Sequence, residues 1–372
     1  MNPPTTKRYV MQKNTICLPE TIIDSHCHGR DLKQSYKTTI RQTLSEALEA
    51  LISISVFMPN TLPAITNLTM LQHQLRLLGN ASKKLCLKNQ QHSHFGLTDQ
   101  NLVECEAALK FREVLGLKDY PLGADGATVT TGTIGVFDPR TRLAGLHLVR
   151  QYRKVYARHC DNPAIIAQEG HTINAEVADV EDMISLASQV PGAKVIICHV
   201  SCRESAELIL KAQKKGLPIA IELCPHYLWF DSDGTNWNQD LDPIFYKCFN
   251  SLRSGEHREF LIHLLLSDNP LIFIGSDNAP HTTQEKIQNK LGGLPSNQEM
   301  VPVICTLAKK HHISNQRVVE LLSWNAGRFL GIRISKKFNR YRLVDKIDDL
   351  AYNNGIITNP WNGSKLLFPQ GD

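Results

Sequence analysis

Residues 193–223 read AKVIICHVSCRESAELILKAQKKGLPIAIEL and divide into three parts. Two apolar runs, AKVIICHV (193–200) and LPIAIEL (217–223), flank a segment whose apolar residues recur at helical spacing, CRESAELILKAQKKG (202–216). Continuous apolar runs of this length are typical of strands that are buried on both faces. A strand, a helix and a second strand in this order predict a parallel pair of strands.

The same alternation of strand and helix recurs along most of the chain. Five further runs predict strands: TIIDSH (21–26), LISISVF (51–57), VLGLKDY (114–120), PAIIAQ (163–168) and NPLIFIGSD (269–277). With a less regular segment near 245–252, the count reaches about eight, so we predict an α/β fold of the (β/α)8 TIM-barrel type. A doubly wound open sheet is the alternative, although no GxGxxG follows the first strand.

The predicted barrel leaves a short segment at each end of the chain. We predict an N-terminal extension over residues 1–20, the barrel over 21–332, and a C-terminal extension over 333–372 that packs on the barrel. The first twenty residues are polar and lack the apolar core of a signal peptide.

Composition narrows the classes of partner. The chain has 372 residues, 42% of them hydrophobic, and its 41 basic and 36 acidic residues are scattered rather than gathered in a basic block. We therefore expect no nucleic-acid partner. No apolar stretch approaches the roughly 20 residues that a membrane helix needs, and the ten cysteines form no CxxC pair. These features predict a cytoplasmic protein with reduced thiols and no membrane association.

Most of the predicted strands end in polar residues that a structural strand would not need. In a TIM barrel these ends meet at one face, where active sites are built. The residues concerned are His26, His28, Asn60, Lys118, His199, Asp277 and His281. Residues i and i+2 of a strand face the same side, so His26 and His28 would converge on one point.

Imidazole and carboxylate groups are common ligands of zinc, so the strand ends predict a metal site. Lys118 fits such a site only if it is paired, distant or modified, because a dication repels an ammonium group. Two further features are interpreted as structural. Cys198 alternates with His199 and is predicted to point into the outer packing layer, and the HSH cluster at 92–94 is predicted to lie at the surface.

Several motifs, taken in their order, resemble those of dihydroorotases, which are members of the amidohydrolase superfamily. The resemblance extends from about residue 21 to the NPWNG segment at 359–363. The motifs are DSHCHGRD (24–31), MPNTLPAITN (58–67), GLKDYP (116–121), VIICHVSCRESAELI (195–209), LPIAIELCPHYLWF (217–230) and IGSDNAPHTTQEK (274–286).

The resemblance implies a zinc-dependent enzyme that interconverts carbamoyl aspartate and dihydroorotate in pyrimidine biosynthesis. His26, His28, Lys118 and Asp277 would hold the more buried of one or two zinc ions, with Lys118 carboxylated by CO2 to an anionic carbamate. His199 would bind the second ion. The family's metal-bound hydroxide attacks the ring amide, and Asp277 matches the residue that moves the proton.

The resemblance also assigns residues to the substrate. Arg30, Asn60 and His281 match the positions that hold the substrate carboxylate, for which a guanidinium fork is well suited. The segment GADGATVTTGTIG (123–135) resembles the mobile loop of the shorter bacterial enzymes, with Thr130 and Thr131 as contacts to the substrate. Homologues are commonly dimers, so a homodimer is expected.

One departure from the family pattern concerns the second metal. A histidine usually follows the strand that precedes His199, and Gln168 stands at the position we take as equivalent; glutamine is a poor substitute for imidazole on zinc. His171, three residues on, would replace it only if its loop folded back. A catalytically impaired homologue with a structural role, for example as a partner of aspartate transcarbamoylase, is therefore an alternative. A hydantoinase or allantoinase activity is a third.

Overall fold

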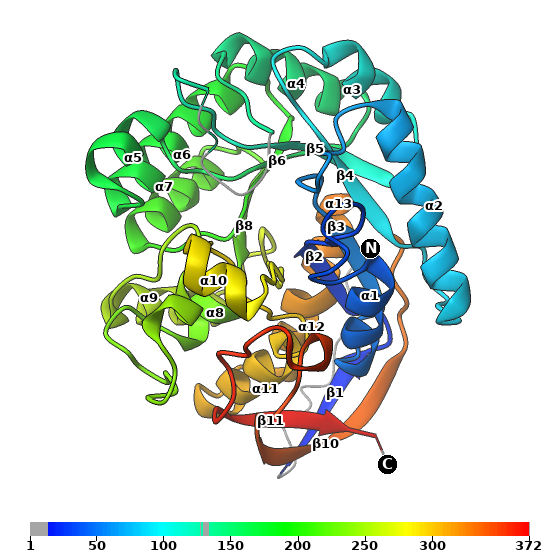
Figure 1. Ribbon diagram of the computed structural model, residues 1–372, viewed down its shortest axis with the longest axis vertical. Coiled ribbons are helices and arrows are strands. Elements are labelled where there is room, and N and C mark those ends of the chain that lie inside the picture. The colour runs from blue at the N-terminus through cyan, green and yellow to red at the C-terminus, as the bar shows by residue number, and fades with distance from the viewer. Residues whose placement is uncertain (1–13, 127, 129–133, 372) are drawn as a thin grey trace, which may run out of the picture.

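Eight parallel strands form the centre of the computed structural model, which describes residues 14–126, 128 and 134–371 (Figure 1). Each strand pairs with the next one along the chain. The strands are β2 (Ile23–Cys27), β3 (Ile54–Phe57), β4 (His92–Gly96), β5 (Val114–Asp119), β6 (Val155–Arg158), β7 (Lys194–Ile197), β8 (Ile219–Leu223) and β9 (Ile272–Ile274). A parallel bridge between Cys27 and Asn278 joins the two outermost strands, so the sheet forms a nearly closed barrel. The predicted TIM-type barrel is confirmed, and the open-sheet alternative is wrong.

Helices connect the strands and surround the barrel (Figure 1). They are α1 (Ile40–Glu49), α2 (Leu68–Lys84), α3 (Leu102–Ala108), α4 (Pro139–Gln151), α5 (Pro163–Glu169), α6 (Ile173–Ser188), α7 (Arg203–Lys214), α8 (Pro225–Trp229), α9 (Gly255–Leu265), α10 (Thr283–Asn289), α11 (Met300–Lys310), α12 (Asn315–Val319) and α13 (Asn325–Leu330). Side-chain caps fix where several of them begin. Thr39 accepts a hydrogen bond from the backbone NH of Gln42 at the start of α1, and Asn67 caps α2 in the same way.

Two of the predicted strands are wrong. Residues 163–168 belong to α5, because Asn162 caps the first turn and Pro163 occupies the first helical position, where its missing NH costs nothing. The segment 245–252 contains the end of a short 3-10 helix, Pro243–Tyr246, and no strand. Strands β4 and β6, for which the sequence predicts nothing, complete the eight.

Apolar side chains fill the barrel interior toward the N-terminal ends of its strands. Val56, Ala157, Ile196 and Phe273 come from four different strands and belong to one buried cluster. Phe329 of α13 packs against Phe273 with ring centroids 5.9 Å apart and covers the N-terminal end of the barrel. The polar residues are consequently concentrated at the opposite end, where the strands terminate.

A second, smaller sheet joins the two ends of the described chain. It is antiparallel, and its strands are ordered β1 (Thr15–Pro19), β10 (Phe338–Ile347) and β11 (Lys365–Gln370). Figure 1 shows this sheet beside α11. The loop before β11 is anchored by Trp361, which is fully buried and donates a hydrogen bond of 2.7 Å to the carbonyl oxygen of Pro295.

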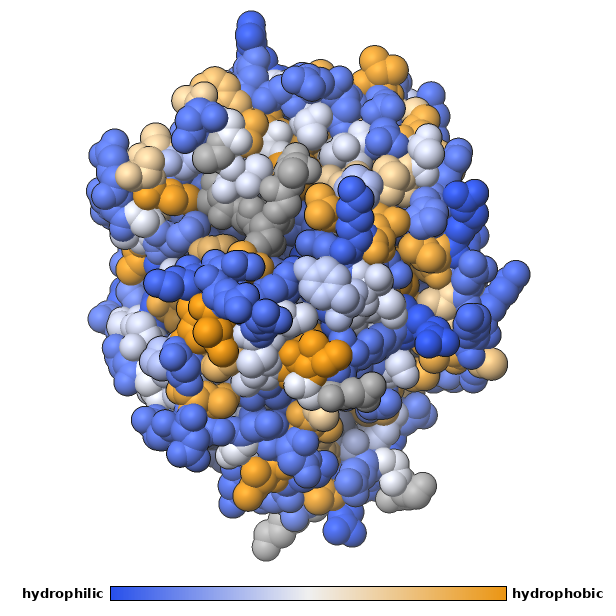
Figure 2. All heavy atoms as spheres, viewed as in Figure 1, coloured by the Kyte–Doolittle hydropathy of each residue, from blue (hydrophilic) through white to orange (hydrophobic). Residues whose placement is uncertain are grey.

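The face seen in Figure 2 carries mainly hydrophilic residues, with hydrophobic residues in small groups. Within the described part of the chain, no helix combines the length and the apolar character that crossing a membrane requires.

Candidate active site

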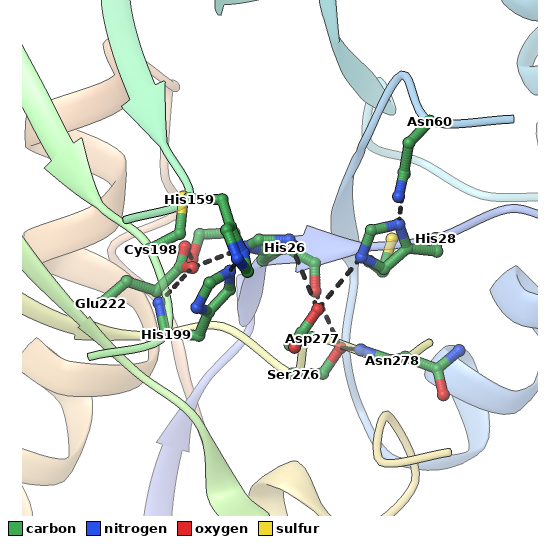
Figure 3. Close-up of polar contacts among 12 residues, drawn as sticks. His26, His28, Asn60, His159, Cys198, His199, Glu222, Ser276, Asp277 and Asn278 are labelled. Atoms are coloured by element: carbon green, nitrogen blue, oxygen red, sulfur yellow. Dashed lines mark hydrogen bonds and ion pairs between the residues drawn. The ribbon is translucent and has the colours of Figure 1, made fainter. Parts of the chain in front are cut away.

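The first half of the site is formed where β2 and β9 end. His26 and His28 project to the same side, and the carboxylate of Asp277 lies against both rings (Figure 3). Oδ1 of Asp277 is 3.4 Å from Nε2 of His26 and 3.0 Å from Nε2 of His28. All three side chains are buried or nearly so.

Neighbouring side chains fix which nitrogen of each ring faces Asp277. Nδ1 of His26 donates to a carboxylate oxygen of Glu222 at 2.7 Å, and Nδ1 of His28 donates to the amide oxygen of Asn60 at 2.6 Å. In a neutral ring with its proton on Nδ1, Nε2 carries a lone pair. Two such lone pairs then face one oxygen of Asp277, an arrangement of acceptors that a cation would satisfy.

The second half of the site is formed where β6 and β7 end. Nδ1 of His159 lies 3.0 Å from Nε2 of His199, and the ring of His199 lies 5.3 Å from that of His26 between centroids (Figure 3). His26, His28, His159, His199 and Asp277 all line one pocket. The two halves are therefore parts of a single site.

The backbone is unusual at two of these residues. His199 has φ of 38° and Asp277 has φ of 46°, both in the left-handed region that non-glycine residues rarely adopt. Asp24 holds the turn before Asp277, accepting hydrogen bonds from the backbone NH of Ser276 at 2.7 Å and from its hydroxyl at 2.6 Å. Such outliers cluster at functional sites, where surrounding contacts hold them.

Lys118 of β5 is fully buried at the centre of the barrel. Its ammonium group donates to the thiol of Cys198 at 3.3 Å and lies 4.6 Å from the ring centroid of Tyr120. Among the described residues it has no carboxylate partner within ion-pair distance. A buried ammonium without a counter-charge is costly.

The residues predicted to bind a carboxylate lie at the other side of the pocket. Arg30 and Asn60 line it, and within the described chain two nitrogens of the buried Arg30 guanidinium, Nε and Nη1, have no hydrogen-bond partner. His281 is buried directly behind the pocket-lining Gly293. Thr130 and Thr131 fall outside the described residues.

Gln168 and its suggested replacement His171 are not part of the site. The segment that contains Gln168 is helix α5 and not a strand, and the side chain of Gln168 is exposed. His171 stacks on Phe249 with ring centroids 4.3 Å apart and contacts Asp161 at 2.5 Å. The residue that follows the strand before β7 is His159, so the equivalence assumed for Gln168 is corrected to His159.

Two structural interpretations are also wrong. Cys198 belongs to the cluster inside the barrel, not to the outer layer, because it faces the same side as Ile196 two residues before it. His199, which has a positive φ, lines the pocket as well. The HSH cluster forms part of β4 and is buried; His94 is fully enclosed. Glu222 of β8 is a site residue that the motifs did not reveal, although its glutamate breaks an otherwise apolar strand.

Electrostatics in the site favour positive charge. Burial acts to lower the pKa of His26, but the carboxylates of Glu222 and Asp277 outweigh it and raise that pKa to about 10. Burial likewise acts to raise the pKa of Glu222, yet His26 holds it at about 2. At neutral pH these carboxylates are ionised, and a dication could supply the charge that a proton supplies here.

The donor set suits zinc. Imidazole nitrogens and carboxylate oxygens are its usual ligands, and His26, His28 and Asp277 present ligand atoms that all lie within 4.8 Å of one another. His26, Cys198 and Glu222 form a second such group. The carboxylate of Glu222 on His26 is the outer-shell hydrogen bond that metal-binding histidines commonly make.

Barrel and pocket together define a (β/α)8 barrel whose strand ends carry a histidine-rich, metal-type site. No family model matches the chain. A dihydroorotase from Thermococcus kodakarensis is 25% identical over 369 residues, which cover 95% of this chain and 80% of that protein. An allantoinase from Enterococcus faecalis is 26% identical over 332 residues, covering 82% and 70% respectively.

Solved structures show the same fold. Dihydroorotase from Saccharomyces cerevisiae, in complex with 5-fluoroorotic acid, superposes with a TM-score of 0.80 at 21% identity, covering 96% of this chain and all of that one. L-Hydantoinase from Arthrobacter aurescens superposes with a TM-score of 0.78 at 20% identity, covering 96% and 84%. Most of the similar curated proteins are named dihydroorotase, so the chain is similar to dihydroorotases at about 25% identity, as a divergent amidohydrolase would be.

Proposed function

We propose that the chain is a zinc-dependent dihydroorotase, which interconverts N-carbamoyl-L-aspartate and L-dihydroorotate in pyrimidine biosynthesis. The observation that carries the proposal is the position of Arg30, a buried guanidinium in the same pocket as the metal-type ligands. A cyclic amide that also bears a carboxylate would use both parts of this pocket: its amide would face the metal-type ligands, and its carboxylate would face Arg30.

We assign one metal to His26, His28, Asp277 and Lys118, and a second to His159, His199 and Lys118. Lys118 would serve both as its carbamate, which removes the positive charge that its surroundings do not balance. A bound zinc ion would lower the pKa of a water molecule to about 7 and polarise the amide carbonyl.

Asp277 is the proton carrier of this proposal. Its carboxylate lines the pocket, and Oδ1 lies within 3.4 Å of both His26 and His28. Burial acts to raise the pKa of Asp277, but the surrounding histidines hold it well below the ordinary value. It is therefore ionised, and it accepts the proton of the attacking water and passes it to the ring nitrogen as the amide bond breaks.

Arg30, Asn60 and His281 would hold the substrate carboxylate. Burial lowers the pKa of Arg30 only to about 10, so the guanidinium stays charged at neutral pH. Its unpartnered Nε and Nη1 carry three of the five N–H donors of the planar guanidinium, a group well suited to bind a carboxylate. Asn60 also receives the hydrogen bond of His28, which links the carboxylate side of the pocket to the metal side.

The second candidate is a hydantoinase or allantoinase, which the similarity to an allantoinase and to L-hydantoinase favours. The impaired-homologue alternative loses the support that Gln168 gave it, because His159 and not Gln168 follows β6; it stays a prediction. Association with aspartate transcarbamoylase and a homodimeric state remain predictions.

A substrate panel separates the two candidates. The zinc-loaded protein is assayed with dihydroorotate, hydantoin and allantoin, and we expect dihydroorotate to have the highest kcat/KM. Arg30→Met should lower kcat/KM for dihydroorotate by roughly 10- to 100-fold, the range for a lost hydrogen bond to a charged group. The same change should leave hydantoin turnover unaltered. A preference of the wild-type protein for hydantoin or allantoin would overturn the proposal.

A further inference from the structure

A buried lysine that the proposed mechanism does not use lies behind the carboxylate side of the pocket. Lys37 lies in the segment between β2 and α1, and only 3% of its side chain is exposed. Its ammonium group is 3.0 Å from Nδ1 of His281 and 2.9 Å from a carboxylate oxygen of Glu285. Lys37 therefore joins an acid of α10 to a histidine next to the pocket.

Glu285 is held in place on its other side. It accepts a hydrogen bond of 2.7 Å from the hydroxyl of Tyr36, and its second oxygen accepts one of 3.1 Å from the backbone NH of Thr282. The latter is part of a capping box at the start of α10. The carboxylate thus neutralises Lys37 and fixes where its ammonium group points.

The contact with Lys37 determines the tautomer of His281. An ammonium group has donors and no acceptor, so Nδ1 of His281 must accept the hydrogen bond. Burial, followed by the charges of Arg30 and Lys37, holds the pKa of His281 well below its ordinary value. The ring is accordingly neutral, and its only proton is on Nε2.

The ring of His281 comes close to the pocket at Gly293, which lines it. Cδ2, the ring atom bonded to Nε2, lies 3.2 Å from the position that a Cβ atom on Gly293 would take. Within the described chain, Nε2 of His281 is buried without a hydrogen-bond partner, as are Nε and Nη1 of Arg30. Donors from two side chains thus remain unused around one end of the pocket.

We propose that Lys37 is a positioning residue that holds His281 in its Nε2–H tautomer, so that His281 and Arg30 both offer donors to the substrate carboxylate. The proposal rests on the proposed dihydroorotase function for its choice of ligand. In the opposite tautomer, Nε2 would present a lone pair and repel a carboxylate. Lys37 would in this way set the preference for carboxylated cyclic amides without touching the substrate.

A matched pair of ligands tests the preference. 5-Fluoroorotate carries the carboxylate, and 5-fluorouracil is the same ring without it. The affinity of each for the zinc-loaded protein is measured by calorimetry in the wild type, Lys37→Met, Lys37→Arg and Lys33→Met. Lys33 lies in the same segment but is exposed, so its loss removes an equal charge outside the network.

We expect Lys37→Met to weaken 5-fluoroorotate binding roughly 10-fold or more, the effect of one lost hydrogen bond to a charged group. Binding of 5-fluorouracil should not change. Lys37→Arg, which keeps a donor, and Lys33→Met should both behave as the wild type. With dihydroorotate as substrate, Lys37→Met should raise KM much more than it lowers kcat. Unchanged 5-fluoroorotate affinity in a folded Lys37→Met protein would overturn the proposal.

The tautomer itself is measured by NMR on protein labelled with 15N-histidine, with the His281 signals assigned by their loss in His281→Asn. We expect the wild type without ligand to show a protonated Nε2 and a bare Nδ1, and Lys37→Met to lose this preference. An unchanged tautomer in Lys37→Met would contradict the proposal. Should the wild type fail to prefer 5-fluoroorotate, the proposed function is wrong, and the NMR result still decides what Lys37 does.

Discussion

At the scale of single residues, the metal side of the site gathers acceptor atoms around His26 and His28. His26 lies between the carboxylates of Glu222 and Asp277, and these raise its pKa to about 10 although it is fully buried. Removing water from two carboxylates is costly unless a cation joins them. A bound metal ion, in place of a proton on His26, would supply this positive charge. It would also leave Nε2 of His26 free to act as a ligand.

The motifs predict five metal ligands, and four of them line one pocket: His26, His28, His199 and Asp277. The fifth, Lys118, donates to Cys198, which lies next to His199 in the chain. The five residues follow apolar runs long enough to predict strands, and the order of the runs predicts where those strands meet. His159 escapes this reasoning because it follows VYAR, a run of only four residues between charged neighbours. Glu222 escapes it because a carboxylate inside a strand gives no motif.

At the scale of the elements, β5 and β6 approach each other closely beside the site. A Cβ atom on Gly116 of β5 would lie 1.9 Å from the carbonyl oxygen of Val155 in β6, a contact that backbone must move to relieve. Gly116 is two residues from Lys118, and Val155 is four residues from His159. The lack of a side chain at Gly116 thus allows the close spacing of β5 and β6 that places Lys118 beside His159.

Gly116→Ala should therefore destabilise the fold by about 3 kcal/mol or more, the upper range for overpacking a core. The free energy of unfolding is measured by urea denaturation. Gly79→Ala in α2 is the control: no atom lies within 4 Å of its added Cβ, and alanine should stabilise the helix by about 0.5–1 kcal/mol. Equal stability of Gly116→Ala and the wild type would contradict the close approach of β5 and β6.

The same elements show how far the sequence predicts the fold. The repeated alternation of strand and helix is sufficient to predict the barrel, since six strands coincide with predicted runs: β2, β3, β5, β7, β8 and β9. The apolar run 163–168 misleads because periodicity cannot separate a short strand from one side of a helix. Its context carries the missing signal: Asn162 and Pro163 mark a helix start, and Gly170 with φ of 77° marks its end.

At the scale of the whole molecule, a group of buried acids connects the barrel to the C-terminal segment. Glu299, before α11, accepts a hydrogen bond from the hydroxyl of Tyr352, and Asp348 lies close enough to affect its ionisation. Burial raises the pKa of Glu299 well above its ordinary value, that of Asp348 to about 6 and that of Glu46 in α1 to about 7. Protonated acids therefore belong to the folded state near neutral pH.

This group predicts how stability depends on pH. The folded pKa of Glu46 is raised from 4.5 to about 7, so its contribution is complete below pH 4.5 and is lost as pH rises toward 7 and above. We expect Glu46→Gln to remove that part of the pH dependence, with a difference on the order of 3 kcal/mol between acid and alkaline conditions. Unfolding free energies measured from pH 4.5 to 8.5 provide the test, and parallel curves for the two proteins would refute it.

We propose that zinc held by this site, with His159 among its ligands, drives dihydroorotate turnover. The most direct measurement is the rate of dihydroorotate hydrolysis by the zinc-loaded wild type, Asp277→Asn, His159→Ala and Gln168→Ala. We predict zinc-dependent turnover in the wild type and Gln168→Ala, and a loss of roughly 100-fold or more in the other two, as when a general base or a ligand is removed. No turnover by the wild type, or full activity in His159→Ala, would contradict the account.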